Sequence, residues 1–174
     1  MEFKDIEALD IKAPQGAFST YDAEILIAEV EKLKPLETYL EVGVDKGKSL
    51  FMARQAANPM TCVYGVDIRE DPKIEGTKFF RGDSRLVAAT WNDNPINVLF
   101  IDGDHSYLGC RIDIESWIKY LLKPGVILFH DHDESSPGVM WAVAEFVDTH
   151  RKEIQEYKVF KRTDRNTSMA LVRL

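Results

Sequence analysis

The sequence has little of several features that would assign a protein to a class at once. It has only two cysteines among 174 residues, Cys62 and Cys110, with neither a CxxC motif nor Cys/His metal spacing. This excludes a disulfide scaffold and the usual zinc motifs, and we expect two buried free thiols. No run approaches the roughly 18 apolar residues of a membrane span, and the first 14 residues are acidic, without the basic and then apolar order of a leader. We therefore expect a cytoplasmic protein with no membrane partner.

Positive charge is also scarce. The chain has 22 Lys and Arg against 29 Asp and Glu, which gives a net charge of -7. Proteins that bind nucleic acid through its phosphates need a basic surface, so we expect no nucleic-acid partner. The length and the hydrophobic fraction of 45% fit one globular domain. We therefore predict a single domain over residues 1–174, with residues 1–20 as an N-terminal extension.

Strand-like and helix-like patterns alternate along the chain. Short runs rich in β-branched and aromatic residues predict strands over 38–42, 62–66, 77–80, 96–101 and 126–129. Helical spacing of apolar residues predicts helices over 21–33, 48–57, 84–91, 106–122 and 139–150, with LKPG ending the fourth. Two strand-like runs in 157–174 predict a closing hairpin. The predicted fold class is α/β: a Rossmann-like single domain whose seven-stranded, mostly parallel sheet has helices on both faces and a C-terminal antiparallel hairpin.

Each predicted parallel strand ends in a polar cluster. The clusters read EVGVDKGKS, VDIRE, RGDS, IDGDHSY and HDHDES in chain order. In an open parallel sheet, ligands bind beyond the carboxyl ends of the strands, near the point where the strand order reverses. The five clusters therefore predict one shared site.

The first two clusters have features of a nucleoside site. Gly43 and Gly47 are spaced GxxxG in a turn that leads into a helix, where backbone N–H groups are unpaired. A dinucleotide site would usually show GxGxxG, which this loop lacks. Asp67 ends the second strand, 24 residues beyond Gly43, where a carboxylate can accept both hydroxyls of a ribose. The alternative is an acid that is merely solvated.

Taken in order, EVGVDKGKS, VYGVDI, FFRGDS, FIDGDHSY and LLKPGVILFHD resemble the class I S-adenosylmethionine-dependent methyltransferases. The sequence is most similar to their small O-methyltransferase-like group, which includes catechol, caffeoyl-CoA and macrolide-sugar O-methyltransferases. The resemblance implies that the first loop holds the methionine part of S-adenosylmethionine, that Asp67 holds its ribose, and that Asp83 and Ser84 face its adenine. The implied cofactor-binding residues are Glu41, Gly43, Gly47, Ser49, Asp67, Asp83, Ser84 and Asp102.

The cation-dependent members of that group imply further roles. An acid at the end of the fourth strand and an adjacent pair after the fifth bind their metal, and these positions fall on Asp102, His130 and Asp131. Their catalytic base lies three residues beyond the first ligand, at His105. Where such relatives have an acid, this chain has His130, and imidazole is a poor ligand for Mg²⁺ and a better one for Mn²⁺. The alternative is that Asp102 contacts the amino-acid end of the cofactor and that His130 and Asp131 are hydrogen-bonding residues.

The predicted function is methyl transfer from S-adenosylmethionine to oxygen of a small molecule or sugar, with His105 as general base and Mg²⁺ or Mn²⁺ as a further cofactor. The pattern leaves N-methylation open, as well as a homo-oligomer in which a second subunit completes the acceptor site. The other functions that the pattern leaves open are an NAD-dependent oxidoreductase, a metal phosphohydrolase and a noncatalytic cofactor-binding protein. Among other side chains, we expect Trp117, Tyr120, Trp141 and Phe146 to pack, and Arg162 and Arg165 to lie in a solvated turn.

Overall fold

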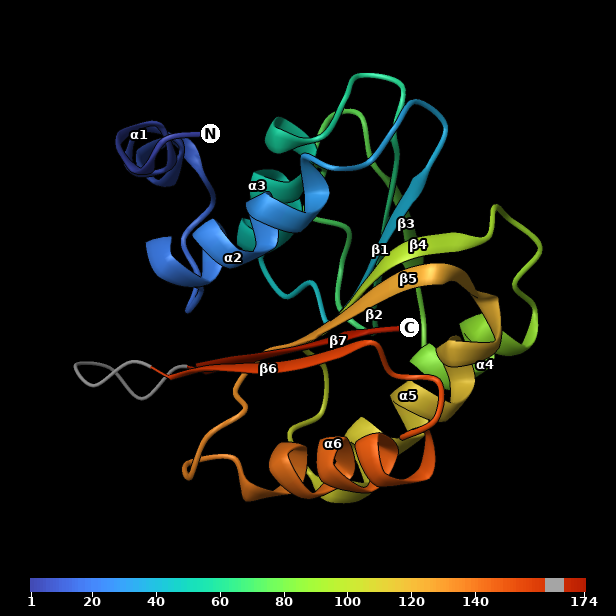
Figure 1. The fold of residues 1–174 in the computed structure, drawn as a ribbon. Coiled ribbons are helices and arrows are strands. Elements are labelled where there is room, and N and C mark those ends of the chain that lie inside the picture. Colours follow the sequence, from blue (N-terminus) through green and yellow to red (C-terminus); the bar gives the residue numbers. More distant parts are fainter. Residues whose placement is uncertain (162–167) are drawn as a thin grey trace.

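A seven-stranded sheet forms the centre of the molecule (Figure 1). We describe it from a computed structural model, in which residues 1–161 and 168–174 are described. The strands are β1 (Thr38–Val42), β2 (Cys62–Asp67), β3 (Lys78–Arg81), β4 (Ile96–Ile101), β5 (Leu121–Phe129), β6 (Glu156–Lys161) and β7 (Ser168–Arg173). Their order is β3-β2-β1-β4-β5-β7-β6, with β7 antiparallel to both of its neighbours and the other pairs parallel. This confirms the predicted fold class.

Helices cover both faces of the sheet. They are α1 (Phe3–Lys12), α2 (Thr20–Val30), α3 (Lys48–Ala56), α4 (Ser84–Ala89), α5 (Tyr107–Trp117) and α6 (Pro137–Thr149). Figure 1 shows α1, α2 and α3 on one face and α4, α5 and α6 on the other. Because neighbouring residues of a strand point to opposite faces, Leu99 and Ile101 of β4 join the α5–α6 core, whereas Val98 and Phe100 join the α2–α3 core. Burial on both faces explains why the strands read as continuous apolar runs.

Helix α1 lies in the segment that we predicted to be an N-terminal extension ahead of the first helix. Its first turn has a capping box formed by Glu2 and Asp5, and Ile6 is buried in the core shared with α2. The first helical pattern of the sequence is therefore the second helix of the structure. We interpreted the acids of this segment only as evidence against a leader, whereas Glu2 and Asp5 cap a helix.

The prediction for residues 118–125 was wrong. Helix α5 ends at Trp117, a 3₁₀ turn follows over Ile118–Tyr120, and β5 already begins at Leu121, which pairs with Ile96 of β4. The LKPG segment is thus part of a strand. Leu122, Lys123 and Pro124 are exposed there, so the missing N–H of proline leaves no buried carbonyl without a partner.

The other sequence predictions had mixed outcomes. Trp117 and Phe146 are buried as expected, whereas Trp141 is 64% exposed, so its predicted packing was wrong. Both cysteines are free; Cys110 is buried, and Cys62 is partly exposed. Arg162 and Arg165 lie outside the described residues. In the part of the chain that the structure describes, no helix combines the length and the apolar character needed to cross a membrane.

Candidate functional site

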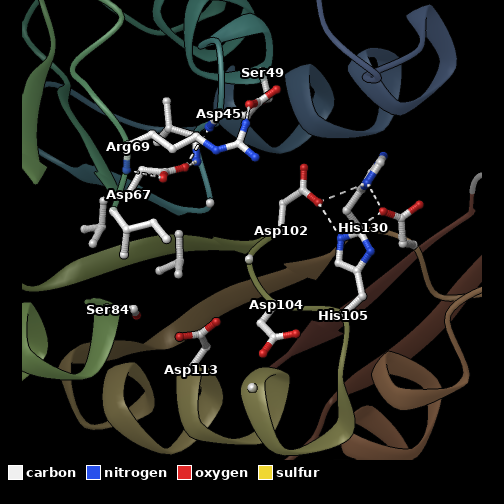
Figure 2. Close-up of a pocket in the computed structure, with 18 of the residues that line it drawn as sticks. Asp45, Ser49, Asp67, Arg69, Ser84, Asp102, Asp104, His105, Asp113 and His130 are labelled. Atoms are coloured by element: carbon white, nitrogen blue, oxygen red, sulfur yellow. Dashed lines mark hydrogen bonds and ion pairs between the residues drawn. The ribbon is translucent and has the colours of Figure 1, made fainter. Parts of the chain in front are cut away.

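A cavity of about 690 Å³ lies at the carboxyl ends of the parallel strands (Figure 2). Residues that follow each of β1 to β5 line it, together with residues 16–18 from the segment between α1 and α2. The chain leaves β1 toward β2 on one side and returns to β4 on the other, so the cavity spans the reversal of strand order. The five polar clusters of the sequence thus meet at one site, as the pattern predicted.

The glycine loop after β1 passes very close to the β4 loop. Gly43 has a φ of 88°, and a Cβ there would collide with the backbone carbonyl of Asp102. Gly47, with a φ of 87°, is the N-cap of α3 and packs against Pro72, outside the cavity lining. Gly43 therefore lets the backbone itself form a cavity wall, while Gly47 shapes the turn that starts α3.

Asp67 ties the glycine loop to the end of β2. Its Oδ2 accepts N–H bonds from Val44 at 2.8 Å and Asp45 at 2.7 Å, and its Oδ1 accepts the Arg69 N–H at 2.8 Å. Figure 2 shows this carboxylate at the cavity wall. Two carboxylate oxygens have about four acceptor positions, and three are filled, so Asp67 Oδ1 retains capacity for a ligand hydroxyl.

Glu41 lies beneath the loop and does not line the cavity. It is fully buried and accepts hydrogen bonds from Tyr39 Oη at 2.7 Å and Ser49 Oγ at 2.5 Å. Burial raises the pKa of Glu41 to about 8. The expectation that Glu41 itself touches the cofactor does not fit this position. Ser49 lines the cavity, whereas Glu41 does not and accepts the Ser49 hydrogen bond from the buried side.

The cavity end near β3 is formed by the start of α4 and the middle of α5. Asp83 caps α4 by accepting the Leu86 N–H at 3.2 Å, and Ser84 Oγ accepts the Trp117 Nε1–H at 2.8 Å. Both residues line the cavity, as does Asp113 of α5, which sequence reasoning missed. Burial raises the pKa of Asp113 to about 6, although the Ser84 side chain lowers it.

The opposite end, near β4 and β5, collects carboxylates and imidazoles. His105 Nε2 lies 3.2 Å from Asp131 Oδ2 and 3.7 Å from Asp102 Oδ1. The Asp102 side chain beside it raises the pKa of His105 above its usual value, and the charge of Asp131 adds to this effect. Burial alone would raise the pKa of Asp102, but the charge of His130 and the contact with His105 lower it. Asp102 is therefore ionised at neutral pH.

His130 lies behind this group, with 4% of its side chain exposed. Its Nδ1 is 3.2 Å from Asp102 Oδ1 and 3.1 Å from Asp131 Oδ2, and its Nε2 is 3.5 Å from Asp22 Oδ2 of α2. None of these contacts has the geometry of a hydrogen bond. Burial alone would lower the pKa of His130, but the charge of Asp102 and the carboxylates of Asp131 and Asp22 raise it well above its usual range.

The structure places His105, which we did not expect to be a ligand, with Asp102 and Asp131. One ligand atom from each of these three residues lies within 4.8 Å of the others, and they are the one such set of His, Cys, Asp or Glu side chains among the described residues. Two carboxylates and one imidazole suit Mn²⁺ or Fe²⁺ as well as an oxygen-preferring cation. His130 contacts both carboxylates from the buried side.

Sequence reasoning missed three residues at the site, and their signals were weak. Phe18 lines the cavity, with its ring centroid 5.4 Å from that of His130. Asp22 is 2% exposed and belongs to a Ser19–Asp22 capping box at the start of α2. Asp113 lies on the buried stripe of α5 with Cys110 and Trp117. A charged residue on an apolar helical stripe was the signal that could have found the last two.

Comparison with known proteins identifies the class. A family model described as a methyltransferase domain matches residues 40–132, which are more than half of the chain and include the first four strand-end clusters and the start of the fifth. The chain belongs to this methyltransferase-domain family, and its fold is that of the class I S-adenosylmethionine-dependent methyltransferases. An uncharacterised protein of Acanthamoeba polyphaga mimivirus is 41% identical over 145 residues, which cover 70% of this chain and 64% of that protein. The chain thus spans less than two thirds of this relative's length.

Solved structures share the fold at low sequence identity. The O-methyltransferase of Bacillus cereus, determined in complex with S-adenosylhomocysteine, superposes with a TM-score of 0.73 at 13% identity, covering 99% of this chain and 90% of that one. The MycE methyltransferase of the mycinamycin biosynthetic pathway, determined with Mg, S-adenosylhomocysteine and mycinamycin VI, gives a TM-score of 0.70 at 13% identity, covering 99% of this chain and 54% of that one. Both likenesses are likenesses of fold.

Proposed function

We propose that this protein transfers the methyl group of S-adenosylmethionine to an oxygen of a small molecule or sugar. The observation that carries the proposal is the convergence of a nucleoside-type wall and a carboxylate–imidazole cluster at the two ends of one cavity of about 690 Å³. The family match favours this reaction over hydride transfer or phosphate hydrolysis. Both solved relatives were determined with S-adenosylhomocysteine, which supports the same cofactor here.

The proposed binding half of the cavity is the part next to β1, β2 and β3. Asp67 holds the ribose, because its carboxylate is fixed by three backbone N–H groups and has acceptor capacity left. The loop backbone at Gly43 and the Ser49 hydroxyl face the methionine portion, while Asp83 and Ser84 face the adenine. Bound there, S-adenosylmethionine would supply a methyl group activated by its sulfonium.

The proposed chemical half contains His105, which acts as the general base. Its side chain is 46% exposed, so its imidazole can reach an acceptor hydroxyl that enters from solvent. When the acceptor oxygen takes the methyl group, His105 takes the hydroxyl proton, and the products are a methyl ether and S-adenosylhomocysteine. Asp102 and Asp131 hold the imidazole in place and stabilise its charged form. An amine acceptor would need the same proton removal, so the site geometry suits either acceptor. The likeness to the O-methyltransferase of Bacillus cereus is what favours oxygen.

A divalent cation fits the same half. Asp102 and Asp131 present carboxylate oxygens close together, and the two unpaired nitrogens of buried His130 lie on the far side of these carboxylates. Asp102 and Asp131 would hold Mg²⁺ or Mn²⁺ through their carboxylates, and the ion would lower the pKa of the acceptor hydroxyl. Because His130 is held as a cation among three carboxylates, we assign it the task of positioning Asp102 and Asp131, and not of binding the ion.

Calorimetric titration with S-adenosylhomocysteine tests the proposal, with and without Mn²⁺. We expect wild type to bind the product in the micromolar range, and Asp67→Ala to bind it about 100-fold more weakly, because a charged acceptor for the ribose and the anchor of the glycine loop are both lost. Asp93→Asn, which removes an acid from a loop outside the cavity, is the matched control and should bind like wild type. Absence of binding to wild type under every condition would remove the methyltransferase assignment.

A further inference from the structure

An acidic side chain that the cofactor roles above do not use lines the cavity. Asp113 comes from the middle of α5 and is 6% exposed. Figure 2 shows its carboxylate directed toward the cavity between Ser84 and Asp104. Gly103 passes so near that a Cβ there would lie 2.8 Å from Asp113 Oδ2. The β4 loop is thus shaped around this carboxylate.

Asp113 has few partners for a buried acid. The Ser84 hydroxyl lowers the pKa of Asp113, and because Ser84 Oγ itself accepts the Trp117 Nε1–H at 2.8 Å, the Ser84 proton is free to point at Asp113. Within the described residues, no lysine, arginine or histidine forms an ion pair with Asp113. Its charged neighbours are Asp83 at the start of α4 and Asp104 in the β4 loop. A buried carboxylate normally has its remaining acceptor positions filled, so this one has room for further N–H donors.

The position of Asp113 matches that of the nucleobase. The reactive cluster lies at the ends of β4 and β5, and Asp67 lies at the end of β2, which is separated from β4 by β1. A cofactor whose methyl group faces His105 and whose ribose lies at Asp67 must extend its base away from β4, toward β3 and α4. Asp113 and Ser84 line the cavity there.

We propose that Asp113 is a specificity-determining residue that accepts a hydrogen bond from the exocyclic 6-amino group of adenine. This inference rests on the proposed function. A 6-amino group is a donor and satisfies the carboxylate, whereas the 6-oxo group of a deaminated base is an acceptor and faces it with a second lone pair. Sites that are built to hydrogen-bond an N–H or O–H group discriminate strongly against analogues without it, because the buried protein group is then left unpaired.

The test compares two probes, S-adenosylhomocysteine and its 6-oxo analogue S-inosylhomocysteine, by calorimetry at pH 7.5. We expect wild type to prefer the adenine form by at least about 100-fold, and Asp113→Asn, whose amide can donate to a 6-oxo group, to reduce this preference to below about 10-fold. Asp148→Asn, on the exposed side of α6, is the matched control and should keep the full preference.

The pH dependence of binding gives a second readout that needs no variant. Burial, with the charges of Asp104 and Asp83, raises the pKa of Asp113 to about 6. Below that pH the carboxyl group carries a proton, and it loses the negative charge that strengthens its hydrogen bond from the adenine amino group. Wild-type affinity for S-adenosylhomocysteine should therefore fall up to about 10-fold per pH unit below pH 6. The affinity of Asp113→Asn for S-adenosylhomocysteine should lack the part of this decrease that is due to Asp113, whatever other groups titrate.

The outcomes separate this inference from the proposed function. If wild type binds neither probe, the proposed function fails. If wild type binds S-adenosylhomocysteine but binds the inosine analogue equally well, or if Asp113→Asn keeps both the preference and the pH profile of wild type, the proposed function stands and the role of Asp113 is overturned. Should Asp113→Asn fail to fold, as judged by circular dichroism, the wild-type preference and pH profile decide.

Discussion

The two ends of the cavity are built in different ways. Near β1 and β2 the polar side chains are held by fixed hydrogen bonds: Asp67 accepts three backbone N–H groups, and Glu41 is clamped by Tyr39 and Ser49. Near β4 and β5 the charged groups face one another at 3.1 to 3.7 Å, and neither ring nitrogen of His130 has a hydrogen bond. Asp67 and Glu41 are thus held by hydrogen bonds before any ligand binds, whereas His130 is not.

This difference indicates a division of work. Groups whose partners are already in place can bind a cofactor with little reorganisation. Groups that are charged, close together and incompletely bonded have shifted pKa values and can change partners, which suits proton transfer and cation binding. This supports the proposed assignment of cofactor binding to the β1–β3 end and of the chemistry to the β4–β5 end.

Removal of the proposed base should give the largest difference between the two ends of the cavity. His105→Ala should lower turnover by about 10²- to 10⁴-fold, the usual effect of losing a general base, while the Kd of S-adenosylhomocysteine changes little. Single-turnover assays with labelled methyl donor and an accepted substrate measure the first quantity. His150→Ala, at the far end of α6, serves as the matched control. Near-normal turnover of the His105 variant would remove it from the mechanism.

Glu41 tests the other end through stability. Its pKa is raised from 4.5 to about 8, so the folded protein keeps a proton that the unfolded chain releases. Stability from this proton is fully present below pH 4.5 and is lost as the pH rises through about 8. Between pH 6 and 8 the free energy of unfolding of wild type should thus fall by about 2 kcal/mol more than that of Glu41→Gln.

Urea unfolding at the two pH values measures this difference. Glu75→Gln, in an exposed loop, is the control and should follow wild type. Parallel pH dependence in wild type and Glu41→Gln would show that Glu41 is ionised in the folded protein.

A smaller effect is expected at Asp22, which supports the β5 end from α2. Asp22→Ala removes the acceptor of the Ser19 N–H and Oγ–H and one of the three carboxylates around His130. It should lower the free energy of unfolding by about 1–3 kcal/mol, while affinity for S-adenosylhomocysteine is kept. Exposed Glu24→Ala on the same helix controls for the loss of an acid. Wild-type stability of Asp22→Ala would show that α2 does not support this end.

The sequence was informative where local pattern and position in the sheet agree. Each parallel strand reads as an apolar run with a polar end, so the shared edge of Gly43, Asp67, Asp83, Asp102 and Asp131 could be predicted from the order of these runs alone. The start of β5 could not, because LKPG is a common helix-exit signal and only pairing with Ile96 and the C-terminal residue Leu174 makes it a strand.

Side-chain direction explains the remaining differences at the site. Glu41 was grouped with the glycines by motif, yet it shares the face of β1 that carries Tyr39, and that face packs against α3. His130 and His105 differ in burial, 4% against 46% exposed, which no local pattern reveals. Asp113 becomes a site residue only because α5 crosses beneath the β4 loop, a tertiary contact between Asp113 and Gly103.

The most direct measurement of the central claim is a paired calorimetric titration with S-adenosylhomocysteine on Asp67→Ala and His105→Ala. We predict that binding is about 100-fold weaker in the first variant and within a few-fold of wild type in the second, because the two side chains belong to the binding and chemical ends of one cavity. Equal losses in both variants, or a loss confined to His105→Ala, would contradict the division.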